Sequence, residues 1–290
     1  MSDKVYTIGQ PDTILAEIGL ERPLRVLSWG CGVQSSTLIA MSLEGDLPLL
    51  DLIVHADTQW ERRDTYRTKE TFVDRIDGRI PVHTVTTGNI RHLGATQHIH
   101  IPFWTSTGAP LNRQCSRDFK IRPIRRHLRE CLGYPASTPP HPRPGSLEQW
   151  LGISWDEWHR MRHSDVAYIT NRYPLIERHM TRNDCIDYML NHGYHVPGKS
   201  ACIGCPYRTA SEWSDMRRNH PDDWSEAVAF DEENRHNPLA ERGGASTADE
   251  LYVYRHLVPL ATADLERDAL RERKAKQLPL VICEEGHCWS

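Results

Sequence analysis

The sequence predicts a doubly wound, mostly parallel α/β sheet, and the alternation of short apolar segments with charged helical ones carries this prediction. Residues 24–29, 49–56 and 82–86 are apolar and rich in strand-forming types. Residues 58–76 and 118–132 are charged stretches with helical spacing. Strands that alternate with helices are typical of βαβ units, whose strands run parallel.

The second half of the chain lacks the regular alternation of strands and helices that the first half has. Residues 135–145 contain five prolines and form a loop, because proline cannot continue regular structure. Residues 147–163 have a helical pattern rich in Trp and Arg. We therefore expect an α/β domain over residues 1–199, followed by a helical, cysteine-bearing C-terminal segment over 200–290.

Composition narrows the class of protein. The 290 residues carry a net charge of -4, which excludes a global electrostatic attraction to nucleic acid or anionic membranes. There is no apolar leader and no apolar run long enough to span a membrane, so we expect a cytoplasmic protein without membrane partners. In a reducing cytosol, the eight cysteines are ligands or redox groups rather than disulfides. Cys131 and Cys185 fall in helical patterns and are predicted to be buried.

A small-residue loop joins the first predicted strand to a helix over residues 35–43. Such a loop lets backbone N–H groups close around an anion, and the helix N-terminus adds its positive end. A Walker A loop is excluded, because no Gly-Lys-Ser/Thr follows. The alternative is a tight turn that binds nothing. The residues predicted to contact phosphate are Ser28, Gly30, Cys31, Gly32, Val33, Gln34, Ser35 and Ser36.

Two polar residues follow the second predicted strand. Asp57 and Thr58 come directly after its apolar run. Open α/β sheets bind ligands at the carboxyl ends of their strands. We therefore expect both residues in the ligand site, with Asp57 beside the small-residue loop, although an Asp-Thr pair can also simply cap a helix.

The loop resembles the PP-loop, Ser-Gly-Gly-X-Asp-Ser, with Cys31 in place of a glycine and Gln34 in place of the acid. Further motifs resemble those of the phosphoadenylyl-sulfate reductase family in the same order along the chain. They are Asp57-Thr58, the Cys115 to Pro123 segment, the Gly152 loop, Tyr173-Pro174-Leu175 and the Cys202-x-x-Cys205 pair. This resemblance, from about Val26 to Tyr207, implies an adenine nucleotide α-hydrolase-like fold, with Gly152 bordering the bound nucleotide.

The resemblance also implies a role for the cysteines. In the family, cysteines of these motifs bind a [4Fe-4S] cluster, so we predict Cys115, Cys202, Cys205 and Cys288 as its ligands. The tail leaves Cys283 as a potentially mobile, catalytic thiol, and the roles of Cys283 and Cys288 can be reversed. A zinc site with four cysteines would need the same residues. Redox-active thiols without a metal are a third possibility.

A basic run begins beside Cys115. Arg117 and Lys120 are the members that we predict to act in catalysis, because guanidinium and ammonium groups suit phosphate or sulfate oxygens. The alternative is that the run is a solvated helix face.

Three functions remain open at this point. The first is an ATP pyrophosphatase that uses ATP and Mg²⁺ to adenylate an acceptor for sulfur transfer. The resemblance to tRNA-thiolation and DNA-phosphorothioation enzymes implies this function. Its partners would be a nucleic-acid acceptor or a sulfur-donor protein. The second is a reductase of adenylyl sulfate or its 3′-phosphorylated form. Ser154 in place of the family's arginine and the single Cys115 favour the first. The third is a non-catalytic nucleotide-binding subunit with structural zinc.

Overall fold

The structure is a computed structural model that describes residues 21–96, 101–135, 139–239, 241 and 250–277. The chain divides into two compact units. The first comprises Met1–Ile101 and Asn112–Cys202, and the second comprises Pro102–Leu111 and Ile203–Ser290. The short segment Pro102–Leu111 thus leaves the first unit and belongs to the second.

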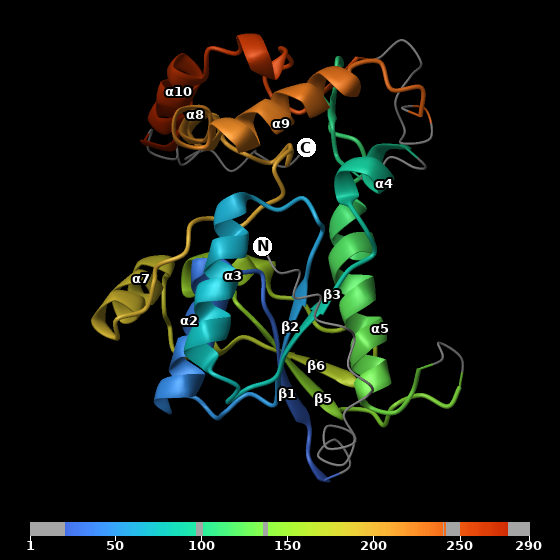
Figure 1. The fold of residues 1–290 in the computed structure, drawn as a ribbon, viewed down its shortest axis with the longest axis vertical. Helices are drawn as coiled ribbons and strands as arrows, with labels where there is room; N and C mark the ends of the chain where they lie inside the picture. Colours follow the sequence, from blue (N-terminus) through green and yellow to red (C-terminus); the bar gives the residue numbers. More distant parts are fainter. Residues whose placement is uncertain (1–20, 97–100, 136–138, 240, 242–249, 278–290) are drawn as a thin grey trace, which may run out of the picture. The chain divides into compact units, whose positions relative to one another are not determined.

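A five-stranded parallel sheet forms the centre of the first unit (Figure 1). The strand order is β3-β2-β1-β5-β6. This confirms the predicted parallel α/β class. The strands are β1 (Leu24–Ser28), β2 (Leu52–Ala56), β3 (Val82–Val85), β5 (Leu147–Leu151) and β6 (Ile169–Arg172).

Helices cover both faces of this sheet because its strands are apolar on both sides. Helices α2 (Val33–Glu44), α3 (Arg63–Ile76) and α7 (Arg182–Asn191) contribute to a core that includes Leu27 of β1. Helix α5 (Arg122–Cys131) packs on the opposite face, in a core with Val26 of β1. The short helices α4 (Ile90–Thr96) and α6 (Pro174–Glu177) complete the unit.

Several predicted boundaries were wrong. Residues 147–163 form β5 and a 3-10 helix, η2 (Trp155–Arg160), instead of one helix. The reason is tertiary: β5 pairs with both β1 and β6, and this pairing, with Leu147 and Trp150 fully buried, outweighs local helix preference. Strand β6 was not predicted. Helix α3 begins only at Arg63, so residues 58–62 form a loop after β2.

The segment before α5 also departs from a simple helix. A π-helical turn, η1 (Arg117–Ile121), leads directly into α5, which has Pro123 in its first turn. π-Helical turns are often found at functional sites. This one carries Lys120.

The second unit is mainly helical. It contains the two-stranded antiparallel sheet β4 (Trp104–Thr105) and β7 (Leu251–Tyr252), with α8 (Ala210–Asn219), α9 (Pro221–Glu233), η4 (Leu260–Thr262) and α10 (Leu265–Gln277). The buried Asp231 carboxylate accepts hydrogen bonds from the backbone N–H groups of Val253 and Leu260 at 2.7 and 2.9 Å. In the described part of the chain, no helix combines the length and apolarity needed to cross a membrane.

We predict that Gly152→Ala destabilises the first unit by about 1–3 kcal/mol, the usual cost of overpacking. A Cβ at this position would lie 2.5 Å from the backbone N of Ser35 and 2.7 Å from its Cα, at the first turn of α2. Gly198→Ala is the matched control, because its Cβ would meet no atom within 4 Å. Urea unfolding of both variants checks the difference, and equal midpoints would show that β5 and α2 do not meet this closely.

Candidate functional site

The β1–α2 loop lies at the point in the sheet where the order of the strands along the chain reverses. The chain proceeds from β1 outward to β2 and β3, and β5 and β6 then fill the other side of β1. Open α/β sheets bind ligands in the crevice at such a switch point, outside the carboxyl ends of the strands. Two turns leave the sheet here: residues 29–32 after β1 and Gly152 after β5.

The start of α2 is open to a ligand. Gly32 is the N-cap residue and provides no side-chain cap for the first N–H groups of the helix. Gly30 is exposed and Gly32 is half-exposed. A Cβ on Gly32 would lie 3.2 Å from Ser200 Oγ, so Ser200 forms one wall of the loop. This arrangement of N–H groups at a helix N-terminus suits an anion.

Cys31 adopts the left-handed conformation that favours glycine, with φ of 56°. This explains why the PP-loop pattern has a glycine at the position that Cys31 occupies. The Cys31 side chain is buried, with Sγ 3.5 Å from Nδ1 of His55 on β2. Burial raises the pKa of the Cys31 thiol, so the thiol stays protonated and acts as packing.

The serines of the loop make internal hydrogen bonds. Ser36 is fully buried, and its hydroxyl accepts from the Trp29 indole N–H at 3.0 Å. The Ser35 hydroxyl donates to the Gly32 carbonyl at 3.2 Å. Ser28 accepts from the side-chain amide of Gln149 on β5. The predicted contribution of these hydroxyls to ligand binding stays a prediction, and in the structure they stabilise the shape of the loop.

Gln34 connects α2 to two other segments, because its side-chain amide donates through the nitrogen and accepts through the oxygen. Its Nε2 donates to Glu157 Oε2 at 3.2 Å and to Ser154 Oγ at 3.4 Å. Its Oε1 accepts from the Arg182 guanidinium at 2.8 Å. An acidic residue here would bring a second carboxylate beside Glu157. The amide therefore has a physical reason to replace the acid of the PP-loop pattern.

Asp57 lies at the carboxyl end of β2, next to β1, which confirms its predicted position. Its backbone N–H donates to the Val85 carbonyl at 2.8 Å and extends the pairing with β3. Its carboxylate accepts from the Gln59 N–H at 2.7 Å and from the Tyr66 hydroxyl at 3.0 Å. These bonds hold the half-buried carboxylate at the edge of the sheet. Its role in binding a ligand stays a prediction.

Glu61 is the centre of a buried network beyond β2. Its Oε1 accepts from Lys120 Nζ at 2.8 Å and from the Thr58 hydroxyl at 3.0 Å. Cys202 Sγ lies 3.7 Å from the same oxygen and 3.3 Å from Thr58 Oγ1. Burial alone would raise the pKa of Glu61, but the Lys120 ammonium outweighs it, and the pKa lies below its usual value. The carboxylate is therefore ionised and paired with Lys120.

Lys69 on α3 is a second lysine at this end of the sheet. Its side chain is half-buried, and it has no ion-pair partner among the described side chains. Burial lowers its pKa, and the nearby charge of Asp57 opposes this shift. An ammonium group that has lost water without gaining a partner is a candidate to bind an anion.

The other predicted site residues are spread over the chain. Arg117 is exposed and donates to Asp118 at 3.0 Å and to Gln114 at 3.0 Å. Cys115 is half-exposed in the first unit, whereas Cys205 belongs to the second unit. Cys283 and Cys288 lie outside the described residues. The shared four-cysteine site therefore stays a prediction.

Residues 25–136 match the family described as phosphoadenosine phosphosulfate reductase domain. This segment is similar to the reductase-like domains of the PP-loop superfamily. No curated protein matches the chain. The reductase-like domain spans β1 to α5 and includes the loop, Asp57 and Lys120. The match supports a function that uses a nucleotide.

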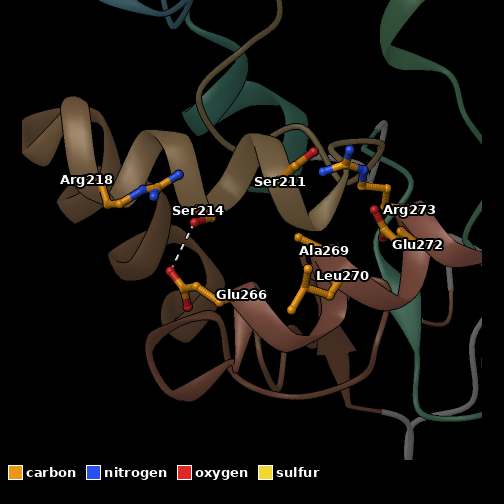
Figure 2. Close-up of a pocket in the computed structure, with 8 residues that line it drawn as sticks. All are labelled: Ser211, Ser214, Arg218, Glu266, Ala269, Leu270, Glu272 and Arg273. Atoms are coloured by element: carbon orange, nitrogen blue, oxygen red, sulfur yellow. Dashed lines mark hydrogen bonds between the residues drawn. The ribbon is translucent and has the colours of Figure 1, made fainter.

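A separate pocket lies in the second unit between α8 and α10 (Figure 2). Its most defined interaction is the hydrogen bond from the Ser214 hydroxyl to Glu266 at 3.0 Å, and Glu266 also pairs with Arg217. Leu270 is 60% exposed at its rim. Ser211 and Glu266 come from the first turns of α8 and α10, but the start of α8 is capped by Thr209 and Glu266 brings a carboxylate. The β1–α2 loop, whose helix begins without a side-chain cap, is therefore the better candidate for a nucleotide.

Glu61 and Lys69 were not among the predicted site residues. Lys69 had a sequence signal, because Thr65, Lys69, Phe72 and Ile76 repeat at helical spacing and place the lysine at the border of the buried face of α3. Glu61 had no such signal in the sequence, because its role depends on contacts with Lys120 and Cys202, which lie far from it along the chain.

We predict that Lys120→Met lowers the free energy of unfolding by about 2 kcal/mol at about pH 7. The substitution leaves the buried Glu61 carboxylate without its counter-charge; the loss is smaller than for a fully buried pair because the Lys120 side chain is 39% exposed. In the wild type the pKa of Glu61 is lowered, so the pair stabilises the fold above the unfolded-state pKa and this contribution disappears as the pH falls.

The difference between Lys120→Met and wild type should therefore narrow as the pH falls through and below the ordinary glutamate pKa of about 4.3, because the ionised state of Glu61 that pairs with Lys120 is lost only below that value. Urea unfolding across this range measures it. Lys274→Met, an exposed lysine on α10, is the control for loss of a positive charge. A difference that does not change with pH would contradict the paired, ionised state of Glu61.

Proposed function

We propose that the first unit binds ATP through residues 30–36 and cleaves it between the α and β phosphates. The observation that supports this most strongly is the uncapped N-terminus of α2 at the β1/β5 switch point. In this reaction an oxygen of the acceptor attacks the α phosphorus, the bond to the β-phosphate oxygen breaks, and pyrophosphate leaves. A sulfur nucleophile then displaces AMP from the adenylated acceptor.

The charges around the loop suit a triphosphate. Backbone N–H groups of residues 32–35 would hold phosphate oxygens, and Lys69 would neutralise further charge. Lys120 is already paired with Glu61, so its main role would be to position the segment after β2. Mg²⁺ prefers carboxylate and phosphate oxygens, and Asp57 is the carboxylate at this edge that would help to hold it.

Ser154 favours ATP over a sulfated nucleotide. In the reductases that the chain resembles, the loop after Gly152 carries an arginine, whereas Ser154 is fully buried here and accepts from Gln34. A short, buried hydroxyl cannot reach a sulfate group as an arginine can. Reduction of adenylyl sulfate, with Cys283 as nucleophile, is the competing function. By resemblance to thiolation enzymes, we propose a nucleic-acid acceptor and a separate sulfur-donor protein.

The [4Fe-4S] cluster remains a proposal from the resemblance. The surroundings of Cys202 fit a protonated thiol better than an iron-bound thiolate, because Sγ lies 3.7 Å from the ionised Glu61 carboxylate. A bound cluster would require Cys202 to give up this contact. The adenylation chemistry proposed above does not depend on the cluster.

We expect Lys69→Gln to weaken ATP binding by roughly tenfold, the loss of one charge-assisted hydrogen bond. Arg67→Gln is the matched control on the same helix, because Arg67 is 74% exposed and pairs with Asp64. Calorimetry with ATP and Mg²⁺ measures the affinity, and analysis of AMP and pyrophosphate measures cleavage. Equal affinities in the two variants would argue against the role of Lys69. Sulfite released from adenylyl sulfate, without pyrophosphate from ATP, would establish the reductase instead.

If the cluster forms, anaerobically purified protein should contain iron and sulfide, and Cys202→Ser should lose both. Cys185→Ser is the control, because Cys185 is a buried thiol in the core under α2. Iron and sulfide analysis, with the visible absorption of the cluster, is the measurement. Wild-type protein without iron and sulfide would rule out the cluster and leave the proposal for ATP intact.

A further inference from the structure

Three potential metal ligands meet between β3 and α5, in a part of the first unit that the proposed nucleotide chemistry does not use. They are His83, His127 and Cys131. One ligand atom from each residue lies within 4.8 Å of the other two, and these are the only three His, Cys, Asp or Glu side chains that gather in this way within the described ranges. We propose that these residues bind a divalent transition-metal ion, with Zn²⁺ as the ion whose ligand preferences fit best.

The secondary structure brings the three side chains together. His127 and Cys131 are four residues apart on α5, so they share one face of the helix. That face packs on the sheet, where Cys131 belongs to the same core as Val85 of β3. His83 comes from β3 itself, which is an edge strand. Two ligands from a helix and one from a strand would fix α5 to the edge of the sheet.

The distances are close to those of a metal site. Tetrahedral Zn²⁺ places nitrogen and sulfur ligands about 3.6 Å apart, and two nitrogen ligands about 3.3 Å apart. Cys131 Sγ lies 3.5 Å from His127 Nε2, and His83 Nδ1 lies 2.8 Å from the same nitrogen. The two imidazole nitrogens need to separate by about half an ångström, and the His83 nitrogen and Cys131 Sγ, which lie within 4.8 Å of each other, need to be about 3.6 Å apart. His83 is half-exposed and has room to move.

The outer nitrogen of His127 has a suitable neighbour. Its Nδ1 lies 3.8 Å from Glu130 Oε2, while Nε2 faces the other two ligands. An approach of this carboxylate to hydrogen-bonding distance would fix the tautomer that leaves Nε2 free to bind metal. His127 and Cys131 are 7% and 1% exposed, so solvent would reach the ion from the side of His83 and supply the fourth ligand.

Metal binding here is a ligand exchange without oxidation. The Cys131 thiol releases its proton to water, and its sulfur forms a bond to the ion. Each histidine binds through a neutral nitrogen, so the His83–His127 hydrogen bond is replaced by two nitrogen–metal bonds. Because α5 continues from the turn that carries Lys120, the ion would also stabilise the segment that reaches Glu61.

Cobalt(II) titration of the full-length protein, after chelator treatment and under reducing conditions, tests this site. Wild type should develop a thiolate-to-cobalt charge-transfer band in the near ultraviolet, and excess Zn²⁺ should remove it. Cys131→Ser should abolish the band, whereas the buried-thiol control Cys185→Ser and the variant Cys202→Ser should keep it. His83→Gln, a change at a half-exposed residue that should not prevent folding, should weaken Co²⁺ binding by roughly tenfold or more.

The metal should also raise the melting temperature of wild type and of Cys185→Ser, and raise that of His83→Gln less at the same metal concentration, because it binds the folded state. A wild-type protein without the band would overturn the proposal and leave a histidine pair hydrogen-bonded beside a buried thiol. A band that survives in both Cys131→Ser and His83→Gln would also overturn it, because the cobalt would then occupy other cysteines.

Discussion

One carboxylate oxygen holds the candidate site together. Oε1 of Glu61 accepts from Lys120 and Thr58 and lies within hydrogen-bonding distance of the Cys202 thiol. These groups come from the turn before α5, from the end of β2 and from the segment that follows α7. A buried carboxylate is costly without partners, so its ionised state requires these segments to meet. The region at the carboxyl end of β2 is therefore held in place by charge pairing as well as by apolar packing.

A second polar junction acts on the other side of the β1–α2 loop. Gln34 joins the start of α2 to Glu157 of η2 and to Arg182 of α7. A neutral amide can donate to the carboxylate and accept from the guanidinium at the same time, which a carboxylate cannot do. The two junctions share no residue, and between them Gly32 starts α2 without a side-chain cap. The loop is held from both sides while its N–H groups remain available.

The sequence was sufficient to predict the part of the fold that depends on local patterns. The apolar runs at β1, β2 and β3 and the small residues before α2 have short-range signatures, and both the parallel sheet and the position of Asp57 followed from them. Strand β5 was mistaken for a helix because its identity depends on pairing with β1 and β6. The role of Glu61 could not be predicted, because its partner Lys120 is 59 residues away.

The two lysines at this end of the sheet show how ion pairing separates a structural role from a binding role. Lys120 is 39% exposed, yet its ammonium is committed to Glu61, and its charge is largely cancelled. Lys69 is half-buried near Asp57 and has no ion-pair partner among the described side chains, so the charge of Asp57 compensates its desolvation only in part. A phosphate group would supply the rest of that compensation, and it would also accept the N–H groups at the start of α2. Both requirements point to the same kind of ligand, a polyanion lying between α2 and α3 at the end of β1.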